Sequence, residues 1–147
     1  MSAEACPLPS RLPGQEASAI DRMLTAKRIA IVGMSDDPMR PSNGIGGYLM
    51  SHGFEIIPVN PNHEKVLGLK CYASLADIPG GVDLVNVFRR PLACADVTRD
   101  AIAIGAKGVW LQSGIRNEEA KRLAEEAHID FVQDRCIMVE HMSRRRR

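Results

Sequence analysis

Short apolar runs alternate with segments of helical periodicity along most of the chain. The first run, residues 28–33, is apolar from Ile29 to Val32 and ends in glycine, which is typical of a strand buried on both faces of a parallel sheet. Between these runs, apolar residues recur three and four positions apart, as on one face of a helix. The pattern predicts strands at residues 28–33, 54–59, 82–88, 108–111 and 130–132. It predicts helices at residues 17–26, 42–53, 91–104 and 117–127, and a last helical turn at 137–142.

This alternation predicts one α/β domain. Because parallel strands need crossover connections, five strands separated by helices indicate an open parallel sheet with helices on both faces, a Rossmann-like arrangement. The expected order of the five strands is 3-2-1-4-5. We expect the domain to span residues 16–142, between a flexible, proline-rich N-terminal segment (1–15) and a basic tail (143–147).

Charge and cysteine content narrow the class of protein. The formal net charge is +1, with 19 basic and 18 acidic residues, which favours neither a specific nucleic acid partner nor a membrane surface. Four of the basic residues form the run 144–147, which we expect to be solvated and mobile. The four cysteines are scattered, no apolar run approaches membrane length, and prolines interrupt the N-terminal segment. These features predict a cytoplasmic protein.

The loop after the first strand is the main candidate ligand site, because open α/β sheets bind ligands beyond the carboxyl ends of their strands. Gly33 permits a tight turn and a close ligand approach, and the next helix, with Ser42 as its expected N-cap, presents free N–H groups to a phosphate. Ser35 and Arg40 add a hydroxyl and a positive charge. Glycines at 44, 46 and 47 disfavour the helix, which indicates close packing or close ligand approach there.

The loop does not match the dinucleotide fingerprint. Ser35 and Pro38 stand where that pattern needs glycine, and Asn60 ends the second strand where an acidic residue would bind the ribose of NAD. Arg89 and Arg90 after the third strand predict a second anion site. No catalytic set is recognisable, and the four histidines lack metal-ligand spacing.

A family resemblance rests on six motifs that occur in order. They are Gly33-Met34-Ser35 with Pro38, Arg40-Pro41-Ser42, Val59-Asn60-Pro61, Val87-Phe88-Arg89-Arg90-Pro91, Trp110-Leu111-Gln112-Ser113-Gly114, and Asp134-Arg135-Cys136 through Glu140-His141. Over residues 18–142 the chain resembles the small stand-alone CoA-binding domain proteins, which are themselves similar to the CoA-binding domain of the succinyl-CoA synthetase alpha subunit.

The resemblance implies a Rossmann-like domain that holds coenzyme A by its ADP end. The first loop would cradle the pyrophosphate through Gly33, Met34 and Ser35, with help from Arg40 and Ser42. The second would lie near the adenosine, with Asn60, His63 and Lys65. The third would line the crevice with Phe88, Arg89 and Arg90, and the fourth would face the pantetheine arm with Gln112 and Ser113.

Three functions remain open from the sequence. The first is a non-catalytic or regulatory protein that binds CoA or acyl-CoA by its ADP moiety. The second is an enzyme, either an NAD(P)-dependent oxidoreductase or a thiol activity at Cys136, which lies near an arginine and a helix start. The third is a structural or regulatory partner protein in which the crevice is vestigial.

Overall fold

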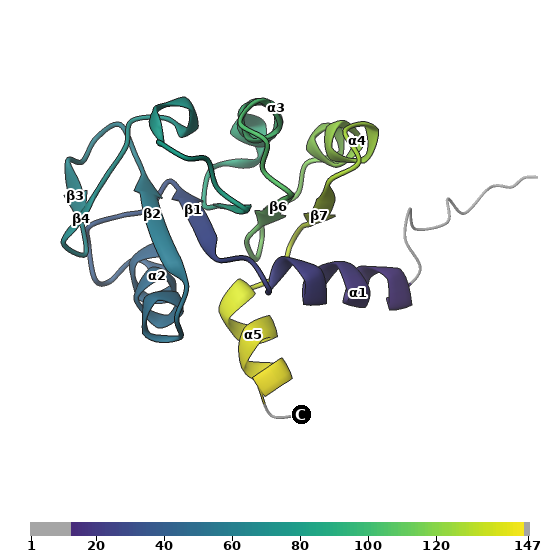
Figure 1. The fold of residues 1–147 in the computed structure, drawn as a ribbon, viewed down its shortest axis with the longest axis horizontal. Coiled ribbons are helices and arrows are strands. Elements are labelled where there is room, and N and C mark those ends of the chain that lie inside the picture. Colours follow the sequence, from purple (N-terminus) through teal and green to yellow (C-terminus); the bar gives the residue numbers. More distant parts are fainter. Residues whose placement is uncertain (1–12, 146–147) are drawn as a thin grey trace, which may run out of the picture.

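The computed structural model describes residues 13–145, which form a parallel five-stranded sheet between two layers of helices (Figure 1). The sheet strands are β1 (Arg28–Val32), β2 (Glu55–Val59), β5 (Leu84–Val87), β6 (Gly108–Leu111) and β7 (Asp130–Val132). The α-helices are α1 (Pro13–Met23), α2 (Pro41–Ser51), α3 (Cys94–Ala103), α4 (Glu118–Glu126) and α5 (Ile137–Arg145). Smaller elements are the antiparallel pair β3 (Lys65–Val66) and β4 (Leu69–Lys70) and the 3-10 turns η1 (Leu75–Asp77) and η2 (Pro91–Ala93).

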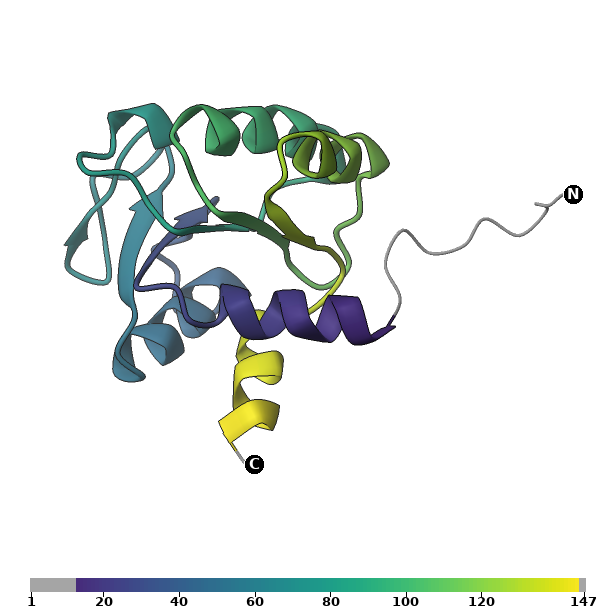
Figure 2. The ribbon, with the colours of Figure 1, turned by 45° about the vertical axis from the view of Figure 1, so that its right-hand side comes forward.

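The sheet separates two apolar layers. Because successive strand residues point to opposite faces, Ile29 and Ile31 pack toward α1, α2 and α5, whereas Ala30 and Val32 pack toward α3, α4 and η1. Figures 1 and 2 show α3 and α4 on one side of the sheet and α1, α2 and α5 on the other. The sequence-based prediction of strands buried on both faces, within one α/β domain, is therefore confirmed.

One strand lies elsewhere than the expected order places it. In the sheet, β1 lies between β2 and β5, and β6 and β7 follow, so the five strands run 2-1-3-4-5 in chain order. The placement of strand 82–88 beyond the second strand was wrong, because β5 is fully buried and paired on both edges. The position beyond β2 is taken by Tyr72, which makes a single parallel bridge to Val59. With that bridge counted as the third strand, the order becomes 3-2-1-4-5-6, which begins with the expected 3-2-1-4-5 pattern.

The helix ends show where local sequence decides structure. Asn117 caps α4, since its side-chain oxygen accepts a hydrogen bond from the Ala120 N–H (2.8 Å), as expected from the sequence. At α2 the expected cap was wrong: Pro41 occupies the first turn and Arg40 precedes it. Ser42 is the second residue of the helix, and its hydroxyl accepts a hydrogen bond from the Ser35 N–H in the preceding loop (2.9 Å).

The expected boundaries of the folded domain change at both ends. At the N-terminus, α1 begins at Pro13, three residues before the expected start of the domain at residue 16; residues 1–12 lie outside the described range. At the C-terminus, the tail expected from residue 143 continues α5 as far as Arg145. The guanidinium of Arg144 pairs with Asp21 (2.6 Å) and Glu140 (2.7 Å), and most of the Arg144 side chain is buried. Residues 146–147 lie outside the described range.

Aromatic and imidazole rings join α5 to α2. The Tyr48 hydroxyl lies 2.7 Å from Nδ1 of His141, and the His52 and His141 rings stand edge to face. Since an arginine can only donate, Arg145 donates to Nε2 of His52 (3.0 Å), and the His52 Nδ1–H donates to the Tyr48 carbonyl (2.7 Å). These hydrogen bonds and ring contacts hold α5 against α2.

Acid should therefore weaken the attachment of α5. Burial, with further contributions from His52 and Arg145, lowers the pKa of His141 below its ordinary value. The unfolded chain then takes up this proton at a higher pH than the folded one, so stability present above about pH 6.5 is lost as the pH falls. We expect the urea midpoint to fall between about pH 7.5 and 5.5, and to fall less in His141→Gln.

The prediction is tested by comparing how the urea midpoint changes with pH in the wild type and in His141→Gln. The exposed His128 has a positive φ that asparagine tolerates, so His128→Asn is a matched control that should keep the wild-type profile. A His141→Gln profile as steep as the wild-type one would contradict the prediction.

Candidate functional site

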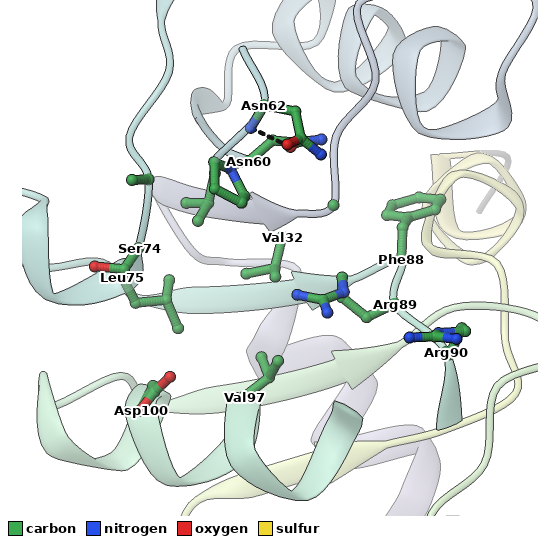
Figure 3. Close-up of a pocket in the computed structure, with 14 residues that line it drawn as sticks. Val32, Asn60, Asn62, Ser74, Leu75, Phe88, Arg89, Arg90, Val97 and Asp100 are labelled. Carbon is green, nitrogen blue, oxygen red and sulfur yellow. Dashed lines mark hydrogen bonds between the residues drawn. The ribbon is translucent and has the colours of Figure 1, made fainter. Parts of the chain in front are cut away.

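The candidate site lies at the topological switch point of the sheet. The chain adds β2 on one side of β1 and later adds β5 on the other side of β1. The switch point is therefore at the carboxyl ends of the neighbouring strands β1 and β5. An open pocket of about 430 Å³ lies there, on the face covered by α3 and η1 (Figure 3). Its walls include the ends of β1, β2 and β5. The structure therefore places a pocket at the edge that the sequence predicted.

Gly33 allows the first and third loops to approach closely. Its φ is +85°, its N–H donates to the Val59 carbonyl (2.8 Å), and a Cβ at this position would stand 2.8 Å from the Phe88 carbonyl oxygen. Any side chain would collide with backbone that cannot easily move. Glycine is thus required by the fold at the pocket wall, as well as permitting close approach of a ligand.

The loop after β1 is tied to the first turn of α2. The Ser35 N–H donates to the Ser42 hydroxyl (2.9 Å), and the Asn43 side-chain amide donates to the Ser35 carbonyl (2.9 Å). The Ser35 hydroxyl accepts from the Asp37 N–H (3.0 Å). These bonds shape the loop, so the serine hydroxyls are already engaged within it. The buried Asn43 was not singled out from the sequence, because nothing in its surroundings distinguishes it from an ordinary helix residue.

Met34 contributes its main chain to this region, because its side chain is fully buried under α2. A Cβ on Gly46 would overlap the Met34 methyl group, whereas Cβ atoms on Gly44 and Gly47 would meet nothing within 4 Å. Close packing therefore accounts for Gly46 and leaves the other two glycines without a packing reason. A role for Met34 in cradling a pyrophosphate would have to come from its backbone.

The loop after β2 brings one predicted residue to the pocket and leaves another outside it. Asn60 lines the pocket, donates to the Met34 carbonyl (3.0 Å) and accepts from the Asn62 N–H (2.9 Å). His63 lies beside the first loop, with Nδ1 3.6 Å from an Asp36 carboxylate oxygen. Lys65 is exposed in β3 and is not part of the pocket wall.

The loop after β5 supplies the positive charge of the pocket. Phe88, Arg89 and Arg90 all line it, and both guanidiniums are exposed. Neither forms an ion pair or a side-chain hydrogen bond with any residue in 13–145, and the same holds for Arg40 in the first loop. Arg89 and Arg90 therefore give this wall of the pocket two guanidiniums whose hydrogen-bond donors are not used by other residues of the described range.

The fourth loop does not reach the pocket. Gln112 is buried, and its Oε1 accepts from the Asn86 side chain and from the Ile137 N–H (both 3.3 Å), so it holds the start of α5. Ser113 is exposed but is not part of the pocket wall. Cys136 is half-buried against the core on the opposite face of the sheet. The sequence analysis expected Gln112 and Ser113 to face the crevice; both follow a strand end, but neither lines the pocket, because the sequence does not show which face a side chain turns to.

The sequence did not single out three polar pocket residues. Asn62 and Ser74 belong to the connection between β2 and β5, and Asp100 lies on α3. Asp100 has the spacing of an ordinary helix-surface residue, so no local signal marks it. Only the packing of α3 against the sheet turns it toward the pocket.

A second hollow, of about 510 Å³, lies at the amino ends of the strands. Its carboxylates are committed to the fold. Asp83 accepts hydrogen bonds from the Arg28 and Lys27 N–H groups (both 3.0 Å), and these bonds lower the pKa of its carboxyl. Asp130 holds Arg22 at 2.7 Å. Both carboxylates of this second hollow are therefore engaged within the fold.

The fold and this pocket define a Rossmann-like α/β protein with an anion-attracting crevice at its switch point. The chain belongs to the CoA binding domain family, since the model of that family matches residues 27–142. It is 41% identical over 116 residues to the uncharacterized protein YneT of Bacillus subtilis (strain 168), a match that covers 79% of this chain and 86% of YneT. The family resemblance inferred from the six motifs is confirmed.

Solved and larger relatives fit the same assignment. A hypothetical protein from Pyrococcus horikoshii OT3 superposes with a TM-score of 0.84 and 39% identity, over 97% of this chain and 98% of that one. The ADP-forming acetate–CoA ligase II of Archaeoglobus fulgidus is 36% identical over 101 residues, which span 67% of this chain but only 15% of the ligase. In residues 13–145 no helix has the length and apolar character needed to cross a bilayer.

Proposed function

We propose that this protein binds CoA or acyl-CoA through the ADP moiety, as a non-catalytic or regulatory module of the cytoplasm. The observation that carries the proposal is the convergence of Arg89 and Arg90, both unpaired within residues 13–145, on the pocket beside Gly33. A diphosphate there would meet two guanidiniums, while the N–H groups at the start of α2 lie at the end of the same loop.

The enzymatic alternatives have less support from the site. An oxidoreductase would need a ribose-binding acid at the end of β2, where Asn60 instead donates to the first loop. The thiol of Cys136 packs on the other side of the sheet from the pocket. Burial raises the pKa of the thiols of Cys71 and Cys94, which favours the unreactive protonated form.

Isothermal titration calorimetry tests the proposal directly. CoA and acetyl-CoA should bind with similar affinity, because the thiol end is not what the proposed contacts hold, and ADP should compete with both. NAD should bind at least about tenfold more weakly. Absence of heat with millimolar CoA, for a chain shown by circular dichroism to be folded, would overturn the proposal.

A further inference from the structure

We propose that Asp100 selects the base of the bound nucleotide by accepting a hydrogen bond from the exocyclic amine of adenine. This inference rests on the proposed function and adds a determinant of specificity to it. The carboxylate lines the pocket from α3, together with residues from three strand ends and from η1.

The two ends of the pocket carry side chains of opposite charge. Figure 3 shows Arg89 and Arg90 near the ends of the strands, and Asp100 with Ser74 at the other end of the pocket. Asp100 lies six residues beyond the first residue of α3, about 9 Å along the helix axis. The buried side chains of Val32, Leu75 and Val97 also line the pocket, and Figure 3 shows Val32 and Val97 between these two ends. A ligand with phosphates at one end, a flat apolar ring in the middle and a donor at the far end would match this wall.

The Asp100 carboxylate has no partner among residues 13–145, neither an ion pair nor a side-chain hydrogen bond. The neighbouring cation, Arg99, is engaged elsewhere, by Asp96 (2.8 Å) and Glu119 (2.6 Å). An ionised carboxylate only accepts hydrogen bonds and repels phosphate. The part of the ligand that reaches Asp100 must therefore carry N–H or O–H groups.

The adenine amine fits that requirement better than the ribose does. In an ADP moiety the amine is the donor farthest from the diphosphate, and it projects from the flat ring that the apolar wall would contact. Ser74 supports this orientation, because its hydroxyl proton is donated to Asp77 (2.9 Å), which leaves its oxygen as a second acceptor. Two acceptors then face a group with two hydrogens.

The test compares CoA with 1,N6-etheno-CoA, in which the amine nitrogen is built into a fused ring and carries no hydrogen. Wild-type protein should bind CoA about tenfold more tightly than the etheno analogue by calorimetry, a difference of about 1.4 kcal/mol. In Asp100→Asn the ratio should fall to about one or reverse, because the amide N–H can donate to the etheno nitrogen. In Asp100→Ala it should fall to about one.

Asp96→Asn is the matched control, since Asp96 is an exposed carboxylate on the same helix that is not part of the pocket wall. It should keep the wild-type ratio. An unchanged ratio in both Asp100 variants would overturn the inference, as it would indicate that the bulk of the etheno ring causes the discrimination. A wild-type chain that binds neither CoA nor the analogue would instead overturn the proposed function, and that result would be evident before any variant is made.

Discussion

Replacing both Arg89 and Arg90 with alanine is expected to weaken CoA binding about a hundredfold. The two guanidiniums lie at the pocket and are unpaired within the described part of the chain, so their hydrogen bonds are available to the diphosphate. Hydrogen bonds to charged groups contribute about 1.5–3 kcal/mol each, and the loss of two sets amounts to about 3 kcal/mol in calorimetry. Because both side chains are exposed, the variant should fold normally.

Arg122→Ala supplies the matched control for charge. Arg122 is also exposed and also unpaired within residues 13–145, but it lies on α4, away from the pocket wall. It should leave the affinity within about twofold of the wild-type value. The wild-type affinity should also fall with added salt, since the contacts are between exposed charges. A double variant that binds CoA as the wild type does would rule out the arginines as the phosphate site.

The Gly33→Ala variant is expected to lose about 2–4 kcal/mol of the free energy of unfolding. Two effects add. A residue with a side chain at a φ of +85° is strained, and strain of this kind costs about 1–3 kcal/mol. Its Cβ would also stand 2.8 Å from the Phe88 carbonyl oxygen, so β1 and β5 would have to separate at the pocket. Urea unfolding measures the loss, and weaker CoA binding should accompany it.

The opposite result is expected at Gly44. This glycine lies in the first turn of α2, and a Cβ there would meet nothing within 4 Å. Alanine is the better helix former by about 1 kcal/mol, so Gly44→Ala should stabilise the protein. If both substitutions had equal effects on the urea midpoint, the strain at Gly33 would be absent and the argument from its backbone would fail.

The strands could be predicted because they satisfy local rules. Each strand of the sheet is a short apolar run, and each run is followed by a turn or a helix start, so period and length alone separate the elements. The position of β5 beside β1 could not be read this way. A right-handed crossover can add a strand on either side of β1, and the choice depends on which edge buries all four β5 residues.

The C-terminal arginines show that the sequence pattern could not predict long-range ion pairs either. A terminal run of four arginines predicts a solvated tail, yet Arg144 meets carboxylates of α1 and α5 and its side chain is only 15% exposed. Asp21 is 123 residues away in sequence, so no local pattern could have indicated the pair. Long-range ion pairs become visible only when the helices are placed.

The candidate site also contains residues that the sequence could predict and residues that only the packing places. Residues at the ends of β1, β2 and β5 were predicted to gather, and Gly33, Asn60, Phe88, Arg89 and Arg90 do so, because parallel strands end at one edge. The other predicted site residues do not line the pocket, although Asp100 does; they are Met34, Ser35, Arg40, Ser42, His63, Lys65, Gln112 and Ser113. The face of the sheet to which a side chain turns, and the depth at which it is buried, depend on how each helix and loop packs against the sheet. Neighbouring residues in the sequence do not specify that packing.

The sequence by itself determined the class of fold, and it predicted the sheet edge where the pocket lies and the arginines on the pocket wall, since these follow from hydrophobic period, glycine and charge. The tertiary structure alone decided which strand lies beside β1, which polar groups are used up in shaping the loops, and which carboxylate faces the arginines across the pocket. The physical reason is that hydrogen bonds and burial join residues far apart in the chain, and only packing brings those residues together.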